Sequence, residues 1–370
     1  MMVNAVMKAK SERRRPFIGN QIEDCRDASG LFYILPFQKG YLLNWDVQKN
    51  IWDHIFGKDV FNLNSNTTVV LTEPLLNFTS IQEATCEIFF EEYEVESLLR
   101  INATDLSVHK YHRDRPKELC CLLVDSGYSF THIIPYIQGK KEKKALCRID
   151  IGGKILTNHL KDLISYRQLN VMDETYVINQ AKEDSCFVSS DFAADMEVTR
   201  GRGEANTILR DYVLPDFTSI KRGYLRARQD SNGKAPNGEQ LIRLNNERFS
   251  IPELLFNPYD VGIQEMGISE AIIHCIQKCP EETRPHLYKN ILLTGGNCNF
   301  PGFRERVFKD VRSMAPDDLT VNVTLAKSPS TYAWHGGAAL SRSSQFPEML
   351  VTRQEWEESG FYVCEKKFSV

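Results

Sequence analysis

Two glycine-containing turns, each at the end of an apolar strand, constrain the fold of this chain more than any other feature. The first follows the apolar run 120–124, where a short polar turn holds Asp125 and Gly127 before an alternating run begins. Two strands joined by so short a turn form a β-hairpin. Asp125 is expected to point its carboxylate into the turn, and Gly127 lets backbone N–H groups approach an anion closely. Alone, this motif fits an ordinary hairpin or one half of a phosphate clamp.

The second turn is the one that a clamp would need. The apolar run 291–293 leads into the pair Gly295 and Gly296, and a helix with apolar residues four apart begins near Phe303. A strand, a double glycine and a helix in this order can seat a nucleotide against bare backbone. An ordinary strand-to-helix turn is the alternative for this motif alone, but the two motifs together favour a nucleotide site.

Length, charge and cysteine pattern exclude several classes of protein. The chain has 370 residues, enough for two domains that share a cleft. Its formal net charge of −4 argues against an overall basic nucleic-acid binder. The ten cysteines form no CxxC pair or His/Cys cluster, so we expect no zinc site. The sequence shows no apolar leader and no long apolar run, so we expect neither secretion nor a membrane span.

Between these motifs, predicted strands and helices alternate, which indicates an α/β fold. Asn44 is expected to cap a helix over 45–56 that Gly57 ends, and Ser80 with Glu83 is expected to form a capping box that opens a helix through Tyr93. Further helices are predicted after Gly152 and Gly153 and near 177–188. Strands are predicted at 69–71 and 145–151, and a strand with a loop at 31–43.

Three polar segments each have more than one explanation. Residues 1–16 are basic and could be a nuclear import signal, a phosphate-contacting patch or a solvated flexible end. The basic run 140–144 is either a solvated loop or a binding site. From about 189 to 244 the apolar density falls, and we expect a surface insertion or mobile loop.

One apolar stretch interrupts that insertion. Tyr212, Leu214 and Phe217 either belong to a strand of a local sheet or bind a partner protein, and the residues alone favour neither.

Several motifs resemble the actin family, and they follow one another in the family's order from Phe17 onward. Besides the hairpin, they are the segments 44–46, 71–74, 246–249, 294–302, 332–337 and 354–360. The resemblance implies an α/β, actin-like fold: two related domains, each subdivided, around a nucleotide cleft. It places a small outer domain at 1–116 plus 333–370 and a large inner domain at 117–332, with the insertion at about 189–244.

The resemblance also assigns roles at the phosphate end of the cleft. Asp125 is similar to the acidic residue that holds a Mg ion through water, and Gly127 to the glycine that contacts phosphate. His132 is similar to the histidine that helps to order the attacking water. The implied cofactor is ATP or ADP with Mg.

At the other end of the cleft, the resemblance implies contacts to the nucleoside. Lys182 and Glu183 fall where the family flanks the adenine and the ribose. Gly295, Gly296 and Phe300 fall on the turn that walls the base. An aromatic edge and a lysine stem suit a flat base.

Departures from the family pattern imply weak or absent hydrolysis. The family's first phosphate hairpin, an Asp-x-Gly turn, has no counterpart in 1–16, and Tyr128 and Ser129 replace a small acidic and glycine pair. Glu96 falls near the glutamine that positions the hydrolytic water, yet an ionised carboxylate cannot donate a hydrogen bond and repels phosphate. Together with Asp125 and His132, Glu96 is therefore expected to form a degenerate catalytic set.

Three segments, 31–41, 163–174 and 211–217, are similar to a nuclear branch of the family whose members are subunits of chromatin remodellers that exchange a histone variant. This implies a non-enzymatic scaffold, nuclear and also cytoplasmic, next to a remodelling ATPase and a small zinc-finger subunit, with chromatin contacted indirectly. The alternatives are an ATP-driven conformational switch and a cytoskeletal filament. A filament is not expected, because the loop by which actin subunits grip each other has no room between Lys10 and Phe17.

Overall fold

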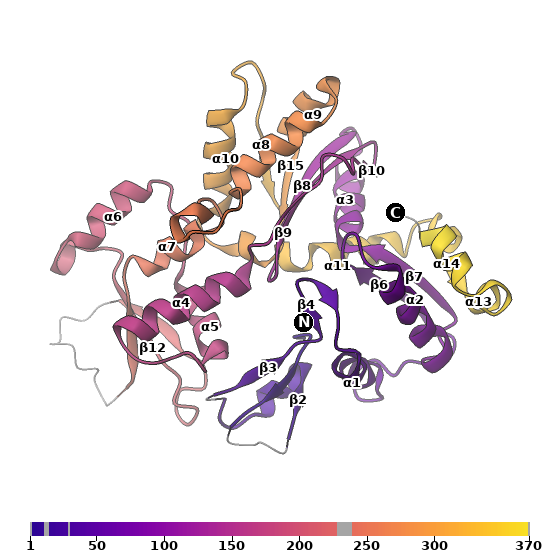
Figure 1. Ribbon diagram of the computed structural model, residues 1–370, viewed down its shortest axis with the longest axis horizontal. Helices are drawn as coiled ribbons and strands as arrows, with labels where there is room; N and C mark the ends of the chain where they lie inside the picture. The colour runs from indigo at the N-terminus through magenta and orange to yellow at the C-terminus, as the bar shows by residue number, and fades with distance from the viewer. Residues whose placement is uncertain (1, 11–14, 29, 228–238, 369–370) are drawn as a thin grey trace.

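The computed structural model of this chain describes residues 2–10, 15–28, 30–227 and 239–368. Figure 1 shows one group of elements around a central mixed sheet and a second group around a small sheet near the C-terminus, with a third, N-terminal sheet between them. The alternation of strands and helices agrees with the α/β fold that the sequence predicts. The domain boundaries remain a prediction.

The central sheet carries both glycine turns. Its order is β10-β9-β8-β15-β16, and β11 also pairs with β9. The strands are β8 (Cys120–Ser126), β9 (Thr131–Ile137), β10 (Lys140–Lys141), β11 (Cys147–Ile149), β15 (Ile291–Thr294) and β16 (Val323–Leu325). The predicted hairpin is confirmed as the antiparallel pair of β8 and β9. Because β15 runs parallel to β8 and pairs Thr294 with Asp125, both turns lie at the same edge of the sheet.

Helices cover this sheet, and most of their buried side chains are aliphatic. They are α4 (Gly153–Arg167), α5 (Thr175–Ser185), α7 (Glu247–Glu253), α8 (Ile268–Lys278), α9 (Arg284–Lys289) and α10 (Phe303–Met314). The helices predicted after Gly152, near 177–188 and at Phe303 are confirmed as α4, α5 and α10. Phe303, Val307 and Val311 are buried along one face of α10, as their four-residue spacing predicts.

The second group surrounds the sheet β17-β7-β6. Its elements are β4 (Phe37–Gln38), β5 (Tyr41–Leu42), α1 (Trp45–Phe56), β6 (Thr68–Glu73), α2 (Thr79–Glu87), β7 (Ser97–Asn102), α3 (Ala103–Asp114), α11 (Tyr332–Leu340), α12 (Phe346–Met349), β17 (Val351–Thr352), α13 (Arg353–Ser359) and α14 (Phe361–Phe368). The cap of α1 is as predicted, because the Asn44 side chain accepts a hydrogen bond from Val47 N at 3.2 Å.

The predicted capping box at Ser80 and Glu83 is wrong. Helix α2 begins at Thr79, and its cap residue is Phe78, two residues before the predicted cap; Phe78 makes no side-chain cap bond. The helix continues into a π-helical turn over Ile88–Glu92 and ends at Tyr93, as the apolar periodicity predicts. Burial of the apolar side, and not a local cap, therefore sets the start of this helix.

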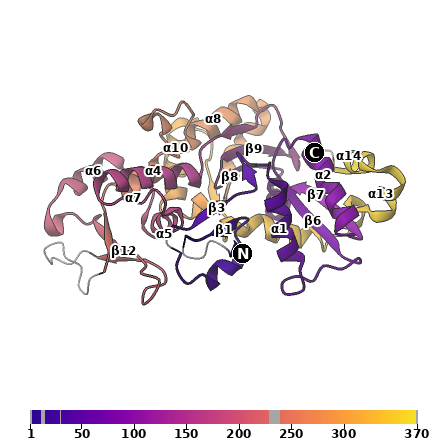
Figure 2. The same ribbon diagram turned by 60° about the horizontal axis from the view of Figure 1, so that its bottom comes forward.

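The N-terminal segment is a packed sheet rather than a solvated flexible end, which corrects one of the explanations above. Strands β1 (Val6–Lys8), β2 (Phe17–Ile18) and β3 (Phe32–Ile34) form a sheet in the order β2-β1-β3. Ala5, Met7 and Ala9 are fully buried in it. Both views place this sheet between α5 and α1 (Figures 1 and 2). Arg13 and Arg14 of the basic cluster lie outside the described residues.

The insertion holds regular structure in its described part. It contains α6 (Phe192–Arg200), β12 (Arg210–Val213), β13 (Tyr224–Ala227) and β14 (Leu241–Leu244), and the strands form the sheet β13-β12-β14. The polar stretch 229–238, which also belonged to the predicted loop, lies outside the described residues.

This sheet includes part of the apolar stretch and argues against a partner contact at Tyr212. Tyr212 is fully buried in β12, and its hydroxyl donates to Asp184 at 3.2 Å. Leu214 packs on the main core, and Phe217 packs on the N-terminal sheet. Tyr212 therefore forms local structure, whereas Leu214 and Phe217 are half-buried, and a partner contact at these two residues stays a prediction.

Among the residues that the structure describes, none of the helices combines the length and the apolar character that crossing a membrane requires.

Candidate functional site

The two predicted glycine turns are in direct contact. Gly295 has a φ of +93°, and a Cβ there would lie 2.2 Å from the Ser126 carbonyl oxygen, so only glycine fits. Asn297, in the same turn, donates from Nδ2 to Ser126 Oγ at 3.0 Å and to the Gly127 carbonyl at 2.8 Å. The turn after β15 is thereby fixed onto the hairpin.

A third turn, at the start of α4, completes the arrangement. Gly153 N donates to the Gly127 carbonyl at 3.1 Å, and Lys154 N donates to the Tyr128 carbonyl at 2.8 Å. A Cβ at Gly152 would lie 2.6 Å from the Tyr128 carbonyl oxygen. From the sequence, this glycine pair signalled only the start of a helix. Its contact with the hairpin depends on tertiary packing and has no local signal.

The three turns enclose a cavity of about 310 Å³. Its lining contains five of the predicted nucleotide-binding residues: Gly127, Lys182, Glu183, Gly296 and Phe300. The remaining lining residues are Tyr128, Gly153, Asn179, Asn297, Asn299 and Ser330. The structure thus brings together residues from the hairpin, α4, α5 and the turn after β15. Gly295 lies directly behind this lining, against the hairpin.

Lys182 lines the cavity, and its ammonium group is hydrogen-bonded to α4 and to α5. The Nζ donates to the Gly153 carbonyl at 3.2 Å, to Thr157 Oγ1 at 3.0 Å and to Asn179 Oδ1 at 3.0 Å. Burial lowers the pKa of Lys182 from its ordinary value. The neighbouring Glu183 is exposed and accepts a hydrogen bond from Asn179 at 2.8 Å. A lysine used in this way supports the wall of the cavity and offers an aliphatic surface to a flat base.

Asp125 and His132 lie opposite each other in the hairpin, behind the cavity and outside its lining. Burial raises the pKa of Asp125 to about 6. Burial also lowers the pKa of His132 to about 4, and the nearby Arg148 adds to this effect. At neutral pH the imidazole is therefore uncharged, and its ring centroid lies 4.3 Å from that of Phe130.

Glu96 does not reach this site. It is exposed at the residue before β7, where its backbone bonds to Thr67 and to Arg353. Arg353 opens α13, which lies on the opposite side of the molecule from α5 (Figure 1). The position inferred from the family pattern therefore does not correspond to a place near the three turns.

Tyr128 is the residue of the hairpin turn that enters the cavity. Its side chain is 45% exposed, and its ring carbon Cδ2 would lie 3.6 Å from a Cβ at Gly153. The ring therefore stands beside the backbone of the glycine turns, where a phosphate would have to approach. Residues missed from the sequence, such as Asn179 and Asn297, are polar side chains without a spacing pattern, so nothing local singled them out.

The lining fits the nucleoside end of an adenine nucleotide better than the phosphate end. A Cβ at Gly296 would meet nothing within 4 Å, so bare backbone faces open space beside the aromatic Phe300. At the phosphate end, two backbone N–H groups of α4 are already bound to hairpin carbonyls. The described residues contain no group of three or more His, Cys, Asp or Glu side chains that could hold a metal ion.

Comparison with known proteins places this arrangement in a family. The family model described as actin matches residues 2–369. Actin-related protein 6 of Drosophila melanogaster is 49% identical over 368 residues, which cover 97% of this chain and 91% of that protein. Actin-related protein 6 of Arabidopsis thaliana is 38% identical over 360 residues, which cover 90% and 85% of the two chains. Actin-like protein ARP6 of Cryptococcus neoformans is 35% identical over 391 residues, covering 100% and 79%.

Proposed function

Since the chain belongs to the actin family, we propose that it is a non-enzymatic scaffold subunit of a nuclear chromatin-remodelling complex that exchanges a histone variant. In this role it binds a remodelling ATPase subunit and a small zinc-finger subunit, and it contacts chromatin through them. The protein is nuclear and also occurs in the cytoplasm. It does not form filaments.

The absence of ATP hydrolysis is proposed from the structure of the hairpin turn between β8 and β9. Tyr128 stands in the cavity at the hairpin turn, and the N–H groups of Gly153 and Lys154 are used within the protein. Hydrolysis needs the reacting groups to be placed within about an ångström, because a larger error costs ~100-fold in rate. Asp125 and His132 lie behind the lining and Glu96 lies elsewhere, which supports the proposal that the protein does not hydrolyse ATP.

ADP or ATP, if held, serves as a structural ligand. Gly296 and Phe300 would face the base, Lys182 and Glu183 would flank the base and the ribose, and Gly127 would face the phosphates. Asp125 would bind Mg only through water, because it lies behind the hairpin turn. Bound nucleotide would supply contacts between the turns and stabilise their mutual position.

The alternative function is an ATP-driven conformational switch, and the cavity itself favours it. Five predicted nucleotide contacts line one space that opens between three separate segments, as expected of a nucleotide site. The two functions differ in turnover: a switch of this kind hydrolyses ATP, whereas a scaffold binds its partners with or without nucleotide.

Recovery of the partner subunits from nuclear extract tests the scaffold role. The full chain is immobilised, and the bound proteins are compared with and without ATP. We expect the remodelling ATPase and the zinc-finger subunit in both samples at equal yield. Absence of both subunits, or recovery that depends on ATP, would contradict the scaffold role.

The described part of the insertion gives a sharper form of this test. Deletion of 189–244 would remove Tyr212 and Ile242, which are fully buried in the core, and would unfold the protein. Helix α6 has no buried residue, so charge changes on it leave the fold intact. We expect Ala193→Arg with Glu197→Lys to reduce partner recovery about ten-fold, while the exposed control Glu282→Lys leaves it unchanged. Equal recovery in both would place the partner contact away from α6.

A further inference from the structure

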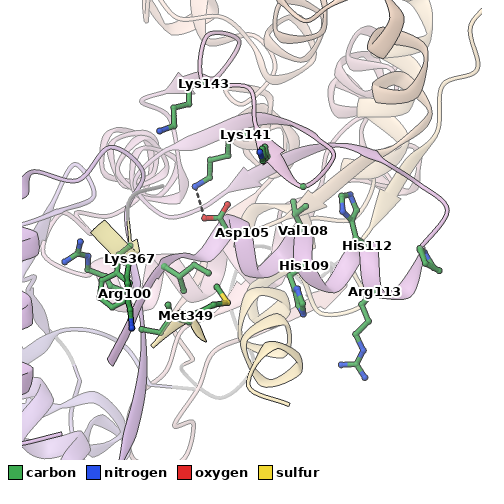
Figure 3. Close-up of a pocket in the computed structure, with 16 residues that line it drawn as sticks. Arg100, Asp105, Val108, His109, His112, Arg113, Lys141, Lys143, Met349 and Lys367 are labelled. Carbon is green, nitrogen blue, oxygen red and sulfur yellow. Dashed lines mark hydrogen bonds and ion pairs between the residues drawn. The ribbon is translucent and has the colours of Figure 1, made fainter. Parts of the chain in front are cut away.

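A second cavity, of about 930 Å³, lies on the exposed face of α3 and is separate from the nucleotide cavity. Its walls are α3, the start of the β9–β10 turn region, β7 and the end of α14. Apolar side chains, among them Ile101, form part of its surface. Figure 3 shows two of them, Val108 and Met349. No proposed role of the protein uses this cavity.

The lining of this cavity, which we call the basic cavity, is strongly cationic. Six cationic residues line it, together with a single carboxylate, Asp105: Arg100, Arg113, Lys140, Lys141, Lys143 and Lys367. The chain as a whole carries a formal net charge of −4. The cations come from separate segments of the chain, so the fold brings them together. The lining is therefore positively charged, although the chain as a whole is negative.

The lone carboxylate of the lining is already neutralised. Lys141 Nζ lies 2.7 Å from Asp105 Oδ2, and the Tyr136 hydroxyl donates to Asp105 Oδ1 at 2.8 Å. Figure 3 shows this ion pair above α3. Two further cations are held by carboxylates outside the lining: Arg100 by Glu73 and Lys367 by Glu355.

Arg113 and Lys140 differ from these three cations. Both are exposed, and neither forms an ion pair with a carboxylate within the described part of the chain. They lie on different walls, since Arg113 belongs to the last turn of α3 and Lys140 to β10. A ligand that reaches both must therefore carry more than one negative group.

The titrating side chains of the cavity have lowered pKa values, chiefly because they are partly buried. Burial lowers the pKa of His109, and the charge of Arg113 adds to this effect. Burial likewise lowers the pKa of His112 and of Lys141. The imidazoles are then neutral at pH 7 and can still donate one hydrogen bond each to an anion.

We propose that the basic cavity binds a small organic anion that carries two or more phosphate groups, with one phosphate at Arg113 and another at Lys140. Arginine and lysine bind phosphate through charge-assisted hydrogen bonds, which are about twice as strong as neutral ones. The apolar surface around Val108 accommodates the carbon body of such a ligand. This inference does not depend on the proposed scaffold role.

A concave site favours a small ligand over a nucleic acid. The cations line one cavity on α3, whereas a duplex needs an extended basic face and favours a basic protein. A single phosphate is also disfavoured, because it would meet only one of the two unpaired cations. Free inositol polyphosphates and phosphoinositide head groups share the required chemistry, so the experiment separates these two sources.

Titration calorimetry of the full chain with inositol hexakisphosphate tests this site. We expect binding with a micromolar Kd that weakens as salt is raised, and inorganic phosphate binding about 100-fold more weakly. Arg113→Gln and Lys140→Gln should each weaken binding about five-fold, and the double variant more than ten-fold. Lys58→Gln, at an exposed lysine beyond the end of α1, should leave the Kd unchanged.

Vesicles that contain a phosphatidylinositol bisphosphate distinguish the two sources. Binding to free inositol hexakisphosphate alone supports a soluble ligand, and loss of vesicle binding in the double variant supports a head group. Equal melting temperatures of the variants show that they fold. No binding of either probe at 0.1 mM (about −5.5 kcal/mol), unchanged affinity in the double variant, or tighter binding of duplex DNA that the double variant does not weaken would overturn the proposal.

Discussion

The ring of Tyr128 occupies the turn where an anion would approach the backbone of the hairpin. Replacement by glycine removes the ring and leaves the strand pairing of β8 and β9 in place. We expect Tyr128→Gly to bind ATP about ten-fold more tightly than the unmodified chain, because phosphate can then approach the turn. Calorimetry with ATP and Mg measures this, with the exposed Tyr259→Gly as the matched control. Equal affinity in both variants would show that Tyr128 does not limit binding.

His132 gives a prediction about pH. Its pKa in the folded protein is lowered to about 4 by burial, below the ordinary value of 6.5. Between these values the unfolded chain takes up a proton that the folded protein does not, so stability is lost as the pH falls below about 6.5. At pH 7 the imidazole is mostly unprotonated in both states, so its titration contributes almost nothing to the free energy of unfolding.

The measurement is urea denaturation at pH 7 and at pH 4.5. We expect the unmodified protein to lose about 2–3 kcal/mol more between these pH values than His132→Gln, which cannot be protonated. The carboxylates contribute equally to both proteins and cancel in the comparison. Identical pH dependence in the two proteins would mean that His132 is solvated in the folded state.

For single residues, the sequence identified members of the candidate site more reliably than it predicted which other residues they contact. Gly127 and Gly296 line the cavity, and the sequence pointed to them because glycine turns after strands have a physical signature. Lys182, Glu183 and Phe300 line it too, but only the family resemblance pointed to them. Glu96 was predicted to lie at the site and does not. A position inferred from a family pattern does not predict contacts when the spacing between segments differs from that of the family. The partner interpretation of Tyr212 failed because an apolar run in a polar segment looks the same whether it faces a core or a surface.

Among the elements, the crossing of α3 and α11 depends on one glycine. A Cβ at Gly336 would lie 2.0 Å from the Leu106 carbonyl oxygen, whereas a Cβ at the adjacent Gly337 would meet only the end of the Leu106 side chain, at 3.4 Å. We expect Gly336→Ala to lower the free energy of unfolding by about 2 kcal/mol or more, because the two backbones must separate. Urea denaturation at pH 7 measures this.

Gly337→Ala is the matched control for that helix crossing. It adds the same methyl group one residue away, where a side chain can shift. We expect it to change stability by less than about 1 kcal/mol, with the gain in helix propensity offsetting the contact. Equal losses in the two variants would show that the helices can move apart freely.

Local signals also decided which elements the sequence could predict. The hairpin and α1 were correct because their strands, turn and cap are adjacent in the chain. The N-terminal sheet was missed because β1 must pair with β3, more than twenty residues away. Its short strands are also stabilised by packing with Tyr176 and Phe217, from distant segments, which no window of the sequence reveals.

For the whole molecule, the N-terminal sheet connects the two groups of elements. Lys10 forms an ion pair with Asp173 at 2.8 Å, and the Gly30 N–H donates to the Glu174 carboxylate at 3.0 Å. On the other side, Asn4 donates to Gln48 of α1 at 3.0 Å. A body tied across its centre in this way is suited to holding neighbours in a fixed geometry.

Phosphate release from labelled ATP tests most directly whether this protein acts without hydrolysis. The purified full chain is mixed in excess with ATP and Mg, beside Asp125→Asn, and inorganic phosphate is followed over hours. We expect release from the unmodified chain to match that from Asp125→Asn and from buffer alone. Release that exceeds both, and that Asp125→Asn abolishes, would show that the protein is an ATPase and contradict the scaffold function.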